Sequence, residues 1–126
     1  MRRREKQSLV MSFRHAFDGV YFVIRSERNA RIHIMTACAV IALGLWLGLE
    51  RTEWALIGIV IGLVFAGEMM NTVAELSVDM LMPEQHELAK FAKDVSAGAI
   101  LVFALTAACV GILVLGPPLL QKLGWG

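Results

Sequence analysis

The chain has 126 residues, of which 57% are hydrophobic and 18% are charged, and its mean hydropathy is +0.64. This balance is too apolar, and its charge too unevenly spread, for a soluble domain of this length. The formal net charge of +1 averages a basic N-terminal part with acidic links. No basic patch with interleaved aromatic residues indicates a nucleic-acid partner. Composition therefore predicts a single all-α integral membrane domain over residues 1–126.

The first element expected along the chain is an amphipathic helix over about residues 8–27. Ser8 is a suitable N-cap. Apolar residues then recur with a period close to 3.6, at Leu9, Phe13, Phe17, Val20 and Ile24. Such a helix lies on the membrane surface, which we favour, or packs against a cytoplasmic link. The basic leader before it, residues 1–7, is expected to be disordered and to touch anionic headgroups.

Uncharged apolar runs then predict three transmembrane helices, at about residues 31–49, 54–79 and 85–116. A short turn at Glu50 to Glu53 makes the first two of them antiparallel neighbours. Pro83 is expected to begin the third helix, because proline suits the first turn. Pro117 and Pro118 are expected to end it, because proline cannot donate a helical hydrogen bond.

Basic residues predict how these helices are oriented. Eight of the twelve Lys and Arg residues lie at or before Arg31, and the link between the second and third spans is followed by Lys90 and Lys93. The turn between the first two spans carries only Arg51. By the positive-inside rule, the N-terminus and the second link lie in the cytoplasm.

The most unusual stretch is the second span, which carries Glu68, Asn71, Glu75 and Asp79. At about 100° per residue, these four side chains share one narrow face of a helix. The residues before them, Trp54 to Ala66, are all apolar or glycine. A carboxylate facing hydrocarbon costs about 3 kcal/mol or more, so this face needs a partner, a cation or water. For Asp79 alone, a solvated helix end beyond the membrane is an equal alternative.

Further polar residues are expected at the same cytoplasmic border, namely Glu27, Lys93 and Asp94. Acidic oxygens beside an ammonium group suit Mg²⁺ and a polyphosphate, since the ion takes one or two carboxylates plus phosphate oxygens. The common nucleotide motifs are absent: residues 62–67 have the glycine spacing of a P-loop but no Lys follows them. His33, at the start of the first span, is expected to hydrogen-bond at the interface, and a metal role for it is disfavoured.

Two neighbouring motifs carry a family resemblance. The first is Glu68-x-x-Asn-Thr-x-x-Glu75-x-x-x-Asp79, and the second is His86-x-Leu-Ala-Lys-x-Ala-Lys93-Asp94. Together they resemble the prokaryotic diacylglycerol kinase and undecaprenol kinase family, and the similarity covers nearly all of residues 12–115. The segments at residues 13–19 and 26–33 look like the undecaprenol kinase branch.

The resemblance implies an activity and an assembly. The activity is ATP- and Mg²⁺-dependent phosphorylation of the hydroxyl of a membrane lipid, undecaprenol in preference to diacylglycerol. The assembly is a homotrimeric helical bundle in the bacterial inner (plasma) membrane, with an N-terminal surface helix and three spans per chain. Its active sites would form between neighbouring subunits at the cytoplasmic surface.

The resemblance also implies roles for six residues. Glu68 would be the base that takes the proton from the lipid hydroxyl. Glu27 and Glu75 would hold the metal that bridges the ATP phosphates. The residues expected to position the nucleotide and the transferred phosphoryl group are Asn71, Lys93 and Asp94.

Other readings of the same residues stay open at this point. A small cation-coupled transporter would explain an intramembrane Glu68, but it needs polar positions at mid-depth in several spans, which residues 34–49 and 100–115 hardly offer. A purely structural subunit is disfavoured by the clustered carboxylates. The acceptor lipid is also open, because a prenol and a diacylglycerol both present a primary hydroxyl beside long apolar chains.

Overall fold

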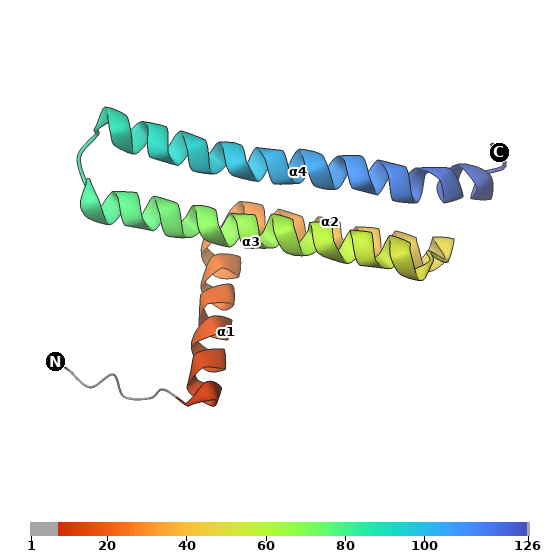
Figure 1. The fold of residues 1–126 in the computed structure, drawn as a ribbon, viewed down its shortest axis with the longest axis horizontal. Coiled ribbons are helices and arrows are strands. Elements are labelled where there is room, and N and C mark those ends of the chain that lie inside the picture. Colours follow the sequence, from red (N-terminus) through yellow and green to blue (C-terminus); the bar gives the residue numbers. More distant parts are fainter. Residues whose placement is uncertain (1–7, 126) are drawn as a thin grey trace.

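The computed structural model describes residues 8–125, and within that range the chain forms helices and no strands. The helices are α1 (Leu9–Ser26), α2 (Arg28–Leu47), α3 (Arg51–Leu81) and α4 (Glu87–Lys122). Helices α2, α3 and α4 run side by side in an elongated bundle, and α1 lies across it (Figure 1). Each of these three bundle helices is long and apolar enough to cross a membrane. The expected basic leader, residues 1–7, lies outside the described residues.

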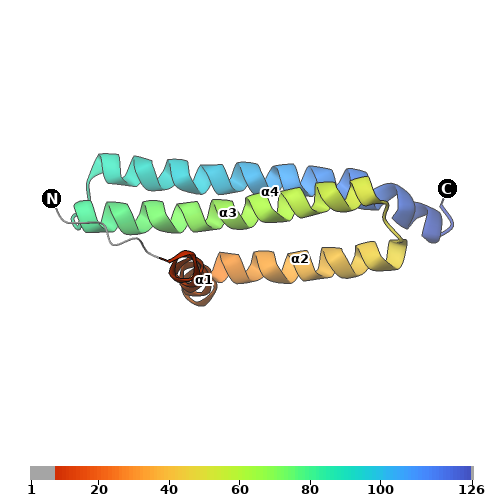
Figure 2. The ribbon, with the colours of Figure 1, turned by 60° about the horizontal axis from the view of Figure 1, so that its bottom comes forward.

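Helix α1 begins as expected, since the Ser8 hydroxyl accepts a hydrogen bond of 3.3 Å from the backbone N–H of Met11. A single residue, Glu27, separates α1 from α2, and its extended backbone (φ −104°, ψ 117°) turns the chain from one helix axis to the other. Val23 and Ala30, on either side of this corner, are buried. Figure 2 views α1 nearly end-on and shows that it leaves the bundle at this corner.

The turn between α2 and α3 is one of the places where glycine is required. Gly48 has a positive φ of 73° and ends α2, donating its N–H to the carbonyl of Gly44. The backbone N–H of Glu50 then donates to the Glu53 carboxylate at 2.9 Å, which fixes the first turn of α3. Helix α3 therefore begins at Arg51, inside the segment predicted to be a turn.

Helix α4 begins later than predicted. Pro83 and the residues after it form a connection, and the helix starts at Glu87, with His86 as its N-cap. The Nδ1 atom of His86 accepts a hydrogen bond of 3.1 Å from the N–H of Leu88. This side-chain acceptor satisfies an otherwise free N–H, so the helix begins at the cap and not at the proline.

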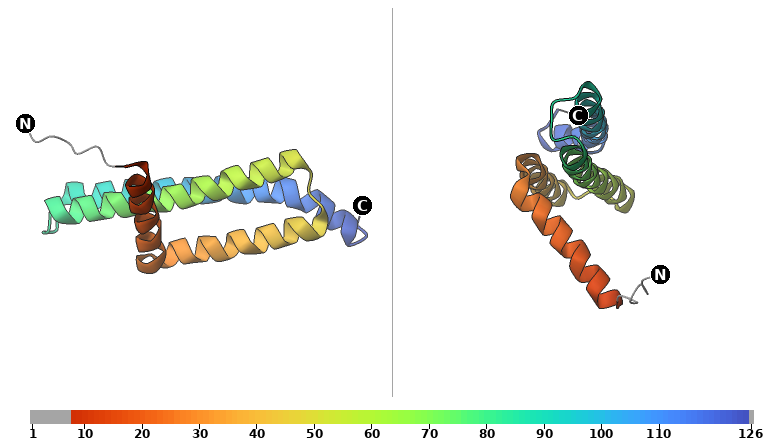
Figure 3. Two further views of the ribbon diagram at one scale, coloured as in Figure 1. Left: turned by 90° about the horizontal axis from the view of Figure 1, so that it is seen from below. Right: turned by 90° about the vertical axis from the view of Figure 1, so that its left-hand side faces the viewer.

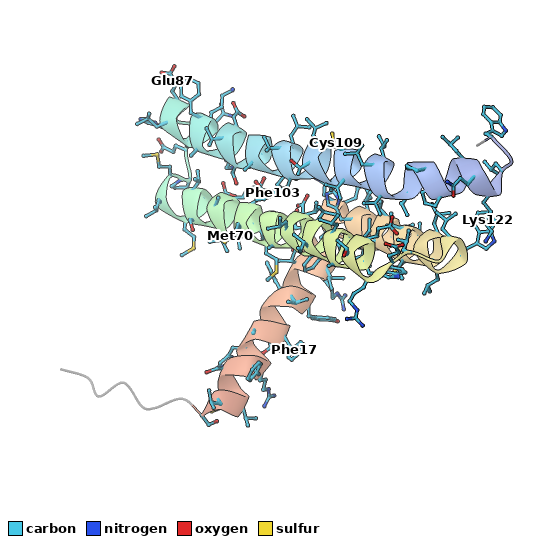
Figure 4. All side chains as sticks on the ribbon, turned by 45° about the vertical axis from the view of Figure 1, so that its right-hand side comes forward. Phe17, Met70, Glu87, Phe103, Cys109 and Lys122 are labelled. Carbon is cyan, nitrogen blue, oxygen red and sulfur yellow. The ribbon has the colours of Figure 1, made fainter. Side chains whose placement is uncertain are left out.

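Helix α4 also continues beyond the predicted end, through Pro117 and Pro118 to Lys122. The prolines each lack one backbone donor, but a tertiary contact holds the last turn in place. Lys122 donates to the backbone carbonyl of Trp46 at 2.7 Å, and its ammonium lies 4.5 Å from the centre of the Trp46 ring. Figure 4 shows Lys122 at this end of α4. The prediction that the proline pair ends the helix was wrong because it considered only local backbone bonding.

The helices of the bundle differ in length. Helix α2 has 20 residues, α3 has 31 and α4 has 36, which correspond to roughly 30, 46 and 54 Å at 1.5 Å per residue. Helices α3 and α4 therefore continue past the corner between α1 and α2 as a two-helix arm (Figure 3). The region in which α2 also lies beside α3 and α4 is the three-helix part of the bundle. The polar residues of α3 divide between this part and the arm.

Candidate functional site

The most buried polar residues lie together near the middle of α3. Glu68 is 1% exposed, Thr72 4% and Asn71 9%. Gly67, just before them, lies so close to α4 that a Cβ atom there would stand 2.8 Å from the ring of Phe103. Helices α3 and α4 therefore approach each other closely beside these buried residues, near Phe103 as labelled in Figure 4.

The partner of Glu68 comes from α2. The Nε2 atom of His33 lies 3.1 Å from Glu68 Oε1, and the His33 side chain is 25% exposed. The Thr72 hydroxyl does not donate to this carboxylate, because it donates to the backbone carbonyl of Glu68. The sequence interpretation placed His33 at the interface as a hydrogen-bonding residue but did not pair it with Glu68. The sequence did contain a signal for this pair. His33 and Glu68 lie on opposite sides of the turn at Glu50 and at nearly equal distances from it along the chain, so two antiparallel helices bring them to the same level.

Asn71 carries an unsatisfied acceptor. Its Oδ1 atom is buried and has no hydrogen-bond partner within residues 8–125. Buried polar atoms are nearly always paired, and leaving one unpaired costs about 1–3 kcal/mol. An amide oxygen of this kind suits a hydroxyl donor or a hard cation such as Mg²⁺.

A second group of charges lies in the two-helix arm. The ammonium of Lys93 on α4 is 2.5 Å from the carboxylate of Asp79 on α3. Asp94 pairs instead within its own helix, with Lys90 at 2.6 Å. Their side chains are 41–72% exposed, so both pairs are accessible to a charged ligand from water.

The two predicted metal ligands, Glu27 and Glu75, are half-buried. Glu27 is the corner residue between α1 and α2, and Glu75 lies on α3 between Asn71 and Asp79. Neither side chain makes a hydrogen bond or ion pair with another residue in the described part of the chain. Across residues 8–125, no three His, Cys, Asp or Glu side chains are grouped so that they could hold a metal ion. Magnesium with a nucleotide needs only one or two carboxylates, because phosphate oxygens and water complete its shell.

The structure therefore sorts the predicted site residues into separate groups. Glu68 and Asn71 share the buried part of α3, whereas Lys93 forms its ion pair with Asp79. The hydrogen bond to Asp79 raises the pKa of the Lys93 ammonium, and Glu75 lies near enough for its charge to raise it further. Among the described residues, the side chains of Asp94 and Glu27 form no hydrogen bond or ion pair with the other predicted site residues.

An apolar cavity of about 730 Å³ lies between α2, α3 and α4. Its walls are almost entirely aliphatic, with side chains such as Ile57, Ile61 and Val64 on α3 and small residues such as Ala104 and Ala108 on α4. His33 lines one end, and Leu119 on α4 lies among its walls. The imidazole thus contacts both the cavity and the buried carboxylate.

A buried acid beside an apolar cavity, in a bundle long enough to cross a membrane, suits an enzyme that acts on a lipid. The sequence matches the profile of the family described as prokaryotic diacylglycerol kinase over residues 14–115. The chain belongs to this family and is a lipid kinase.

Individual relatives agree with this assignment. The chain is 40% identical over 117 residues to a protein named undecaprenol kinase from Bacillus subtilis, covering 93% of this chain and 95% of that protein. It is 43% identical over 115 residues to a diacylglycerol kinase from Synechocystis, covering 90% of this chain and 66% of that protein. It is 30% identical over 94 residues to a diacylglycerol kinase from Haemophilus influenzae, covering 75% of this chain and 80% of that protein.

Proposed function

We propose that this kinase transfers the terminal phosphoryl group of ATP, with Mg²⁺, to the hydroxyl of undecaprenol, giving undecaprenyl phosphate. The observation that carries the proposal is the buried Glu68 carboxylate, which meets His33, a residue that also lines an apolar cavity. The choice of acceptor is supported by the relative named undecaprenol kinase, which aligns along nearly its whole length. Diacylglycerol is the alternative acceptor, and two relatives carry that name.

Glu68 is the general base in this proposal. A lipid whose chain occupies the cavity has its hydroxyl at the end where His33 and Glu68 meet. The carboxylate accepts the hydroxyl proton as the oxygen attacks the terminal phosphorus of ATP. The bond between that phosphorus and the bridging oxygen breaks, and ADP leaves.

The nucleotide lies on the water side of Glu68. Glu27 and Glu75 would hold Mg²⁺, which supplies neutralising charge to the phosphate oxygens. The unpaired amide oxygen of Asn71 is a further acceptor on the same face. Lys93 balances the negative charge that spreads over the transferred group, and Asp94 helps to position the nucleotide.

The membrane arrangement follows from charge and exposure. Phe13 and Phe17 on α1 are 65% and 70% exposed, and Figure 4 shows Phe17 projecting from the helix. We place these side chains in the cytoplasmic surface of the bacterial inner membrane, with α1 as an amphipathic surface helix. The N-terminus and the arm of α3 and α4 then lie on the cytoplasmic side, where ATP is available.

A homotrimer completes the proposal. Large apolar side chains remain exposed on all three bundle helices, Met70 among them at 67%. Within residues 8–125, the side chains of Glu27 and Asp94 form no hydrogen bond or ion pair with the other proposed site residues. In a trimer, residues of one subunit would meet those of the next, so that each active site forms at a subunit boundary.

A competition assay tests the acceptor. Purified protein in mixed micelles receives labelled ATP, Mg²⁺ and equal amounts of undecaprenol and diacylglycerol, and the labelled lipids are separated and counted. Label mainly in undecaprenyl phosphate is the expected result. Label mainly in phosphatidic acid would assign the enzyme to diacylglycerol, and label in neither lipid from folded protein would overturn the proposal.

A further inference from the structure

The buried carboxylate of Glu68 needs a stabilising donor. An ionised carboxyl group that is 1% exposed is costly unless it is hydrogen-bonded or paired. Within residues 8–125, the one side-chain donor placed against it is the imidazole of His33. The neighbouring polar groups do not serve, because the Thr72 hydroxyl is used by a backbone carbonyl and no donor approaches from Lys93, which pairs with Asp79.

We propose that His33 is the positioning residue of this kinase: its Nε2–H donates to Glu68 Oε1, holding the carboxylate ionised and in one orientation, and leaves Oε2 to accept the proton of the lipid hydroxyl. The inference rests on the proposed role of Glu68 as the base. His33 acts through Glu68 and exchanges no atom with either substrate.

The position of His33 on α2 brings it to both the Glu68 carboxylate and the cavity. Glu68 lies on α3, and a donor on another helix ties its carboxylate to the packing of the two helices that border the cavity. His33 lines that cavity while contacting Glu68. The imidazole therefore sets where the base stands with respect to an acceptor chain in the cavity.

The first test compares two substitutions at His33. His33→Ala removes the donor, and we expect kcat to fall about 10- to 100-fold, as for loss of a hydrogen bond to a charged group, while KM for ATP stays within about twofold. His33→Gln keeps an N–H donor without an imidazole, and we expect it to restore kcat to within about threefold of the unmodified enzyme. A purely structural role would lower the amount of folded enzyme and leave kcat per folded molecule unchanged.

The matched control is Thr106→Val. Thr106 is a polar residue within α4 whose hydroxyl donates only to the carbonyl of Val102 in its own helix, and it does not line the cavity. We expect its kcat to stay within about twofold of the unmodified enzyme. Folding of every variant is checked by circular dichroism and size-exclusion chromatography.

A second readout does not depend on the acceptor lipid. In protein labelled with ¹⁵N-histidine, the Nε2 resonance of His33, assigned by its loss in His33→Gln, should move when Glu68 is replaced by Gln. If it does not move, or if kcat of His33→Ala stays within twofold of the unmodified enzyme, or if His33→Gln is as slow as His33→Ala, the inference is wrong. If the resonance moves but neither lipid is phosphorylated, the proposed function fails and the pairing stands.

Discussion

Two acidic positions on the same face of α3 differ in almost every physical respect. Glu68 is 1% exposed and meets a histidine of another helix. Asp79, about three turns further along, is 62% exposed and pairs with Lys93. The difference arises because Glu68 lies where α2 packs beside α3 and α4, whereas Asp79 lies in the arm, where α4 is the neighbouring bundle helix.

The comparison teaches that helix length, and not residue type, gives the two acids different surroundings. A carboxylate inside the three-helix part is shielded from water, so its interactions with neighbouring polar groups are strong. A carboxylate in the arm is hydrated and screened, and an ion pair there contributes little to stability. The inner position therefore suits proton transfer, and the outer position suits contact with a charged, water-soluble nucleotide.

The largest effect is expected at the inner position. Glu68→Gln preserves size and burial but removes the proton acceptor, and we expect kcat to fall about 100- to 10,000-fold, the range for loss of a general base. Initial rates of lipid phosphorylation measure the loss, with circular dichroism and gel filtration to show that the protein is folded. Full activity in a folded Glu68→Gln protein would contradict the assigned role.

A packing change at Gly67, next to the buried Glu68, should lower both stability and activity. Gly67→Leu forces a side chain against Phe103, and overpacking of this kind typically costs about 1–3 kcal/mol, so the unfolding midpoint and the activity should both fall. The matched control is Gly62→Ala on the same helix, because no atom lies within 4 Å of a Cβ added at Gly62. Equal stability of Gly67→Leu and Gly62→Ala would show that α3 and α4 are not in close contact at this level.

The outer position should affect activity without affecting stability. In Lys93→Met the pair with Asp79 is lost, and we expect about a tenfold or greater loss of kcat/KM for ATP, because a charge that balances the transferred phosphoryl group is removed. The thermal unfolding midpoint should not change measurably, because the pair is exposed. Lys90→Met, which breaks the Lys90–Asp94 pair, is the control and should be milder. A large drop in midpoint for Lys93→Met would make the arm a stabilising element instead.

The smallest effect is expected at the far end of the bundle. Lys122→Ala removes the contact with Trp46, in which an exposed cation over an aromatic ring contributes about 0.5–1 kcal/mol. We expect a slightly lower unfolding midpoint and activity within about twofold of the unmodified enzyme. Gln121→Ala, in the same turn, is the control. A large loss of activity in Lys122→Ala would mean that this end of α4 communicates with the site.

The sequence by itself was enough for the helical class, the three helices of membrane length, the family and the kinase activity. Each of these depends on local properties: apolar runs of spanning length, a 3.6-residue period, and two motifs at fixed spacing. The assigned roles of the six site residues stay predictions, namely those of Glu68, Glu27, Glu75, Asn71, Lys93 and Asp94.

The tertiary structure decided which of these residues are buried and what they contact. The start of α2 at the corner after Glu27, and the register fixed by the turn at Gly48, place His33 against Glu68. The contact of Lys122 with Trp46 accompanies a helix that runs through Pro117 and Pro118. Periodicity describes one helix at a time, whereas burial and pairing depend on where a neighbouring helix begins, ends and aligns, and that is a property of the packed bundle.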